Sequence, residues 1–211
     1  MRAQDDQEWT IPDYDEEIEN VKILVSTCKR ELGTNKVEVI PHFNEILNRE
    51  LSAITDILVK IDLFHASARC ARAALELTAI NLYRYFYPGG RLMDMSFWEK
   101  YGLRRLSHRT ESPLLKLVRD GVLDEVEFGL FCESYSNLSE YVHHRITYEL
   151  CHTLPKKIKS EQYYAEVVRL AGKRGRIARI VKATLIKYSL EPALEVLLVL
   201  LRDYKRIKSK L

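Results

Sequence analysis

The stretch that decides the fold is residues 62–87, DLFHASARCARAALELTAINLYRYFY, which is followed by Pro88-Gly89-Gly90. Alanine and leucine are the strongest helix formers, and they recur throughout this stretch. A proline followed by two glycines cannot continue a helix. The sequence therefore predicts one long helix over 62–87 that stops at the Pro-Gly-Gly turn.

Helical patterns lie on both sides of this segment. After Pro12, apolar residues recur every three or four positions as far as Leu32, and Gly33 follows as a C-terminal stop. Further helices are expected from Pro41, after Ser112-Pro113 up to Gly121, from Asp124 to about His152, and over 160–171, 176–188 and 191–209, the last capped by Ser189. No strand-like alternation persists. The predicted fold class is all-α, with an antiparallel helical bundle.

Two regions are expected along the chain. Residues 1–155 are predicted to form an acidic N-terminus followed by the helical bundle, and residues 156–211 a basic helical extension. The last helix of this extension carries seven leucines and valines between Leu194 and Leu201. So much apolar surface is expected to pack on the bundle or on a second chain.

Composition excludes several classes of protein. The chain has 211 residues, of which 46% are hydrophobic and 30% charged, as expected for a soluble globular protein. No apolar run approaches the roughly 20 residues of a membrane span, and the N-terminus is acidic, so a cytoplasmic location without membrane contact is predicted. The four cysteines have no metal-ligand spacing and are expected to be small core residues; no metal or cofactor is predicted. A low glutamine content together with a high share of charged residues favours a thermophilic source organism.

Charge is distributed unevenly along the chain. Residues 1–20 carry eight acids against one arginine, whereas residues 155–211 carry fifteen Lys and Arg against five acids. Either the acidic N-terminus screens the basic region, within one molecule or across a dimer, or the basic region binds a polyanion such as RNA or DNA. A solvated helix face is the third interpretation. The candidate nucleic-acid-binding residues are Lys173, Arg174, Arg176, Arg179 and Lys182.

Two segments resemble a known family. Residues 68–77 read ARCARAALEL, and residues 135–145 read YSNLSEYVHHR. Together they are similar to the HEPN superfamily (higher eukaryotes and prokaryotes nucleotide-binding), over about residues 60–155. The resemblance implies an up-and-down four-helix bundle that usually forms a homodimer. It also implies either a metal-independent endoribonuclease, of the kind found in antiviral defence, toxin–antitoxin and CRISPR systems, or a member that only binds RNA.

Active members of that family use an arginine and a histidine on one helix, and Arg145 and His152 fit this pattern, with six residues between them. Residues seven apart lie two turns apart on one helix face, about 10 Å along the axis. The guanidinium of Arg145 can hold a scissile phosphate, and the imidazole of His152 can move a proton near neutral pH. By the resemblance, cleavage leaves a 2′,3′-cyclic phosphate without a metal.

Several alternatives remain open at this stage. His152 can instead cap a helix C-terminus before Pro155, and Arg145 can form a surface or interface salt bridge. His143 and Glu76 are secondary catalytic candidates, although Glu76 is favoured as the ion-pair partner of Arg72 four residues earlier. A non-catalytic RNA-binding protein is slightly favoured over an active endoribonuclease. The alternative is a helical adaptor or assembly protein with a partner bound through residues 191–209.

Overall fold

The computed structural model describes residues 12–34, 39–61, 64–88, 117–142 and 176–208. Within these ranges the chain forms helices joined by turns and contains no strand, which confirms the predicted all-α class there. The helices are α1 (Tyr14–Thr34), α2 (Phe43–Asp56), α3 (Phe64–Phe86), α6 (Glu125–Val142), α9 (Arg176–Leu185) and α10 (Glu191–Lys208). Two π-helical turns accompany them, at Ile57–Ile61 and Ile186–Leu190.

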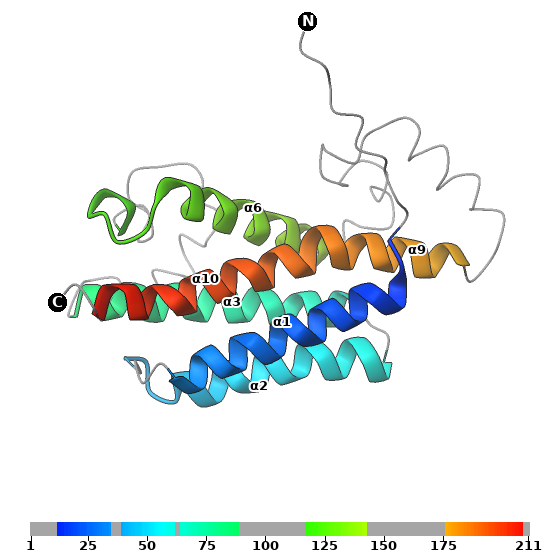
Figure 1. Ribbon diagram of the computed structural model, residues 1–211, viewed down its shortest axis with the longest axis horizontal. Coiled ribbons are helices and arrows are strands. Elements are labelled where there is room, and N and C mark those ends of the chain that lie inside the picture. Colours follow the sequence, from blue (N-terminus) through cyan, green and yellow to red (C-terminus); the bar gives the residue numbers. More distant parts are fainter. Residues whose placement is uncertain (1–11, 35–38, 62–63, 89–116, 143–175, 209–211) are drawn as a thin grey trace, which may run out of the picture.

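The helices pack side by side, and α10 takes a central place among them (Figure 1). α1 packs on α2, α2 packs on α3, and α6 packs on α3, while α10 contacts α1, α3 and α6. α1, α2 and α3 alternate in direction, but α10 runs parallel to α1 and α3. The predicted boundary near residue 155 lies outside the described residues.

The start of α1 follows from a capping side chain. Asp13 Oδ1 accepts hydrogen bonds from the backbone N–H groups of Asp15 at 2.9 Å and Glu16 at 3.1 Å. These bonds satisfy N–H groups that have no partner within the helix. The apolar stripe that predicted this helix, including Val21 and Cys28, is buried, and the helix ends two residues beyond the expected Leu32.

The boundaries of α3 and α6 also follow from local signals. α3 ends at Phe86, two residues before Pro88. α6 begins after a reciprocal cap, in which the Glu127 N–H donates to Asp124 Oδ1 at 2.8 Å and the Asp124 N–H donates to Glu127 Oε2 at 3.0 Å. This is the capping box that defines a helix N-terminus. The predicted end of this helix near His152 lies outside the described residues.

The two predicted C-terminal helices are one continuous helical run, which corrects the expected cap at Ser189. Ser189 lies inside the π-helical turn Ile186–Leu190, and the N–H of Glu191 donates to the carbonyl of Ile186, five residues earlier. Pro192 has no N–H, and its ring would clash with a carbonyl in a regular α-helix. A wider turn directly before the proline accommodates this ring without ending the helix.

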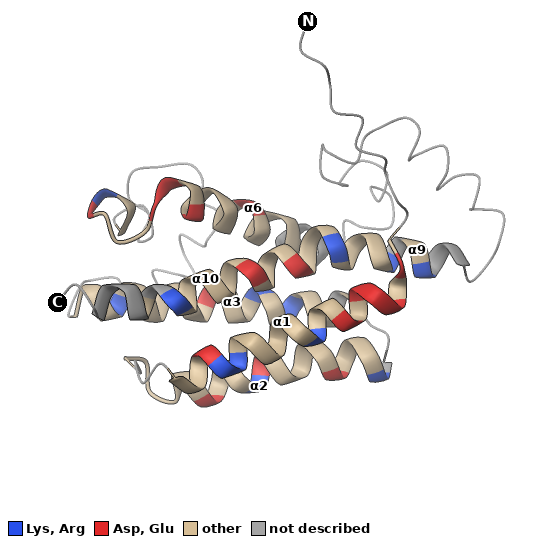
Figure 2. Ribbon diagram, viewed as in Figure 1, with Lys and Arg blue, Asp and Glu red and all other residues tan. Residues whose placement is uncertain are grey.

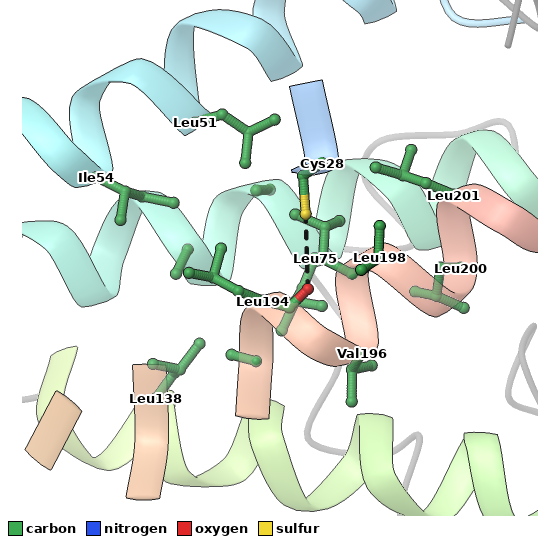
Figure 3. Close-up of a cluster of buried hydrophobic side chains, with 14 of the residues drawn as sticks. Cys28, Leu51, Ile54, Leu75, Leu138, Leu194, Val196, Leu198, Leu200 and Leu201 are labelled. Atoms are coloured by element: carbon green, nitrogen blue, oxygen red, sulfur yellow. Dashed lines mark hydrogen bonds between the residues drawn. The ribbon is translucent and has the colours of Figure 1, made fainter. Parts of the chain in front are cut away.

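The core lies where α10 meets the other helices. Figure 3 shows leucine and isoleucine side chains from α2, α3, α6 and α10 in one buried cluster, with Cys28 of α1 among them. The thiol of Cys28 donates to the carbonyl oxygen of Leu194 at 3.6 Å, which ties α1 to α10. The fully buried aliphatic side chains include Leu47, Leu51, Ile54, Leu75, Leu82, Leu138, Leu194 and Leu197.

The apolar residues of α10 face this core. Leu194, Leu197 and Leu201 are at most 1% exposed, and Val196, Leu198 and Leu200 are also buried. They pack against α1, α3 and α6 of the same chain. Over its described residues, α10 therefore offers no leucine face to a second protein, the surface on which the adaptor hypothesis for residues 191–209 depended.

Candidate nucleic-acid interface and catalytic residues

The predicted catalytic pair lies beyond the end of α6. Arg145, His152 and His143 fall outside the described residues, which reach Val142 before the next gap. Their separation and their surroundings therefore stay predictions. The structure does describe residues 135–142, the first part of the segment that contains Arg145, and they lie on α6.

Glu76 lies on α3 and is half-buried. Burial raises the pKa of this carboxyl group, and the positive charge of Arg72 lowers it by a smaller amount. A carboxyl group in such surroundings holds a proton more readily than one in water. Glu76 therefore stays a secondary candidate, and Arg72 is the charged neighbour that the sequence predicted for it.

Arg72 joins the two motif segments. Its Nε and Nη2 atoms donate to the hydroxyl oxygen of Tyr135 on α6, at 2.9 and 2.7 Å. The guanidinium carbon lies 4.9 Å from the centroid of the same ring. Tyr135 is buried and stacks on Phe131, with ring centroids 6.0 Å apart. Sequence spacing suggested Glu76 as the partner of Arg72 but gave no signal for Tyr135, which is 63 residues away.

The candidate nucleic-acid-binding residues are only partly described. Lys173 and Arg174 lie outside the described residues. Arg176 is the first residue of α9, but its side chain is not described. Arg179 is exposed, and Lys182 is half-buried one turn further along. Residues three apart lie on neighbouring positions of a helix surface, so these two cations share one side of α9.

Arg179 is held by the start of α1. Its Nη2 atom donates to both carboxylate oxygens of Asp15, at 2.8 Å each, and its guanidinium carbon lies 5.3 Å from the centroid of the Tyr14 ring. Figure 2 shows acidic residues at the start of α1 beside the basic residues of α9. Of the three interpretations of the charge asymmetry, this contact is an instance of screening within one molecule.

A second charged cluster was missed in the sequence. Glu17 is only 1% exposed, and it accepts from Lys187 Nζ at 3.0 Å and from Asn20 Nδ2 at 3.2 Å. Lys187 lies in the π-helical turn. The hydrogen bond with Glu17 is the main cause that raises the pKa of Lys187. The sequence contained one signal that Glu17 is buried, because Glu17 lies four residues before Val21 and therefore on the apolar stripe of α1.

Glu191 completes this cluster. Burial is the main cause that raises its pKa to about 8, and the neighbouring carboxylate of Glu17 raises it further. Asn20 and Lys187 act in the opposite direction. Ionisation of Glu191 would place a second negative charge beside the Glu17 side chain in a buried site, so Glu191 keeps its proton near neutral pH.

Metal and thiol chemistry have little support in the described part of the chain. No group of three or more His, Cys, Asp or Glu side chains there could hold a metal ion. Cys28 is buried in the core as predicted, whereas Cys70 and Cys132 are half-buried. Burial raises the pKa of the Cys28 thiol to about 12 and those of Cys70 and Cys132 to about 11, which disfavours the reactive thiolate.

None of the helices in the described residues combines the length and the apolar character that a membrane span requires.

Comparisons with protein-family models, with curated proteins and with solved structures find no match to this chain. The HEPN superfamily therefore remains a resemblance carried by the two sequence segments.

Proposed function

We propose that the protein is a HEPN-like RNA-handling protein, and that RNA binding is its main activity. The observation that supports this proposal is the contact between Arg72 and Tyr135. The two segments that carry the resemblance lie on α3 and α6, and the guanidinium of one donates to the tyrosine hydroxyl of the other. Segments more than sixty residues apart in the sequence thus meet, as residues of one functional site must.

The basic segment supplies the affinity in this proposal. Lys173, Arg174, Arg176, Arg179 and Lys182 contact phosphates without reading the base sequence. Each neutralised phosphate releases condensed counterions, so affinity falls steeply as salt rises. Binding of a labelled single-stranded RNA is measured at 50 and 300 mM salt. A dissociation constant that barely changes between the two would contradict this role.

The catalytic form of the proposal assigns cleavage to Arg145 and His152. The 2′-hydroxyl attacks the adjacent phosphorus, the bond to the 5′-oxygen breaks, and a 2′,3′-cyclic phosphate and a free 5′-hydroxyl result. Arg145 holds the phosphate and stabilises its developing charge. His152 donates the proton that the leaving 5′-oxygen takes up, and His143 or Glu76 is a secondary candidate to accept the proton of the 2′-hydroxyl.

The test is an incubation with labelled structured and single-stranded RNAs in EDTA. The Arg145→Ala and His152→Ala proteins are run beside the original chain, and Arg49→Ala is the matched control. Arg49 is an exposed arginine on α2 whose guanidinium lies 3.9 Å from Glu50. Cleavage that both site variants lose and the control keeps supports the endoribonuclease. If the RNA stays intact in every lane, RNA binding is the activity that remains. If no RNA binds under any condition, the proposal is contradicted.

A homodimer is part of the proposal. Two copies would bring two Arg145–His152 pairs together across one groove. Light scattering of the purified protein measures its mass in solution, and a single 24.7 kDa species at micromolar concentration would contradict the dimer.

A further inference from the structure

The basic side of α9 is already occupied in the free protein. Arg179 presents its guanidinium to both oxygens of the Asp15 carboxylate, at 2.8 Å each, and lies over the Tyr14 ring. A carboxylate and a phosphate both match the donors of a guanidinium. Asp15 therefore fills the place that a backbone phosphate of RNA would take at Arg179.

The contact is exposed, so a phosphate can reach it. The side chains of Arg179 and Asp15 are 58% and 78% exposed. An ion pair in water contributes little net stability, because the solvent and salt screen both charges. A polyanion that brings several phosphates and releases counterions can therefore displace the carboxylate.

Asp15 is nevertheless held close to Arg179 by the rest of α1. The backbone N–H of Asp15 is capped by Asp13, and two residues later Glu17 is buried against Lys187 at 3.0 Å. Only the Asp15 side chain has to rotate away for the contact to open. A group tethered in this way acts at a high effective concentration against any ligand from solution.

Neighbouring charges add to this competition. Asp13, directly before α1, and Glu16 and Glu19, in its first two turns, are also exposed. They surround the contact with negative charge, which repels an approaching phosphate. Asp15 alone among these acids has a described bidentate contact with a candidate nucleic-acid-binding residue.

We infer that Asp15 is an internal competitor for phosphate at Arg179, so that the start of α1 restrains RNA binding by the basic face of α9. This inference rests on the proposed function for the identity of the polyanion. RNA binds by replacing the Asp15 carboxylate with one of its phosphates, while Glu17 keeps α1 packed against the π-helical turn.

The test compares full-length proteins by fluorescence anisotropy with a labelled single-stranded RNA of about 20 nucleotides. Asp15→Asn removes the charge and keeps the size of the side chain. Glu19→Gln is the matched control, because it removes one exposed charge from the same helix and its partner is Lys22, at 2.9 Å. The loss of an exposed ion pair corresponds to about two- to fivefold tighter binding by Asp15→Asn. Glu19→Gln should show a smaller gain.

A double-mutant cycle separates the contact from net charge. The gain from Asp15→Asn should vanish when Arg179→Ala is already present, because the carboxylate then has no guanidinium to cover. An equal gain with and without Arg179 would overturn the inference, since a general loss of negative charge would explain it. A gain from Glu19→Gln as large as that from Asp15→Asn would overturn it as well.

A second probe distinguishes this inference from the proposed function. If no protein binds RNA, the proposed function fails, and the same series is repeated with labelled inorganic polyphosphate. Tighter polyphosphate binding by Asp15→Asn that depends on Arg179 supports the internal competitor without RNA. No gain with either probe, or no binding of polyphosphate by any variant, overturns it.

Discussion

Asn81 on α3 donates through Nδ2 to the hydroxyl oxygen of Tyr204 on α10, at 3.1 Å, and both side chains are buried. The Tyr204 hydroxyl in turn donates to the carbonyl oxygen of Thr78 at 3.3 Å. Asn81 Oδ1 accepts from the backbone N–H groups of Val39 and Ile40, at 3.1 and 2.9 Å. One amide thus ties the chain before α2 and the end of α10 to the same turn of α3.

Asn81→Ala should lower the free energy of unfolding by about 2–3 kcal/mol, because it leaves buried hydrogen-bonding groups without their partner. Tyr204→Phe should cost less, about 1 kcal/mol, since it removes one hydroxyl and keeps the packed ring. Urea denaturation of both variants measures the two values. A smaller loss for Asn81→Ala than for Tyr204→Phe would contradict the central role of the amide.

The helix boundaries could be predicted from the sequence because their causes are local. Asp124 and Glu127 are three residues apart, and the stop after Phe86 is set by the next few residues. The partners of Asn81 could not be predicted, because they lie 41 to 123 residues away and depend on how the helices pack.

The π-helical turn and the partners of the charged residues could not be predicted from the sequence. Ser189, three residues before Pro192, predicts a new helix with a cap, but packing against α1, α3 and α6 favours one continuous helix with a wider turn. Burial of Glu17 depends on Lys187, which lies 170 residues away. Arg179 was predicted to face nucleic acid, and its pairing with Asp15 required the arrangement of α1 beside α9.

Two glycines allow a matched test of backbone conformation. Gly121 has a φ of 69°, in the left-handed region, whereas Gly129 lies within α6, and a Cβ added to either would meet no atom within 4 Å. Gly121→Ala should therefore destabilise the protein by about 1 kcal/mol through backbone strain alone. Gly129→Ala should stabilise it by roughly 0.5–1 kcal/mol, because alanine favours the helix. Thermal unfolding measures both, and shifts of the same sign would contradict the assigned conformations.

The place of α10 in the core leads to another prediction. Leu194 is fully buried, and its replacement by alanine should lower the free energy of unfolding by about 3 kcal/mol, through lost apolar burial and a cavity. Val126 on α6 is 69% exposed, so Val126→Ala should change the value by less than about 0.5 kcal/mol. Denaturant titrations followed by circular dichroism compare the two. If Leu194→Ala left the main unfolding transition unchanged, α10 would not belong to the cooperative core.

The cluster of Glu17, Lys187 and Glu191 predicts how stability depends on pH. The pKa of Glu191 is raised from its ordinary 4.5 to about 8, so between these values the folded protein holds a proton that the unfolded chain has released. Stability then falls as pH rises through this window. Above pH 8, Glu191 loses this proton, and its negative charge then lies in a buried site beside Glu17 and Lys187.

Glu191→Gln should remove this part of the pH dependence, because glutamine is neutral at every pH and remains able to donate to Glu17. The variant should match the original protein near pH 5 and exceed its melting temperature at pH 9. Glu195→Gln is the control, since Glu195 is an exposed acid one turn further along α10. Melting temperatures measured from pH 4.5 to 9 decide the matter. A Glu191→Gln protein that loses stability across this window as steeply as the Glu195→Gln protein would contradict the raised pKa of Glu191.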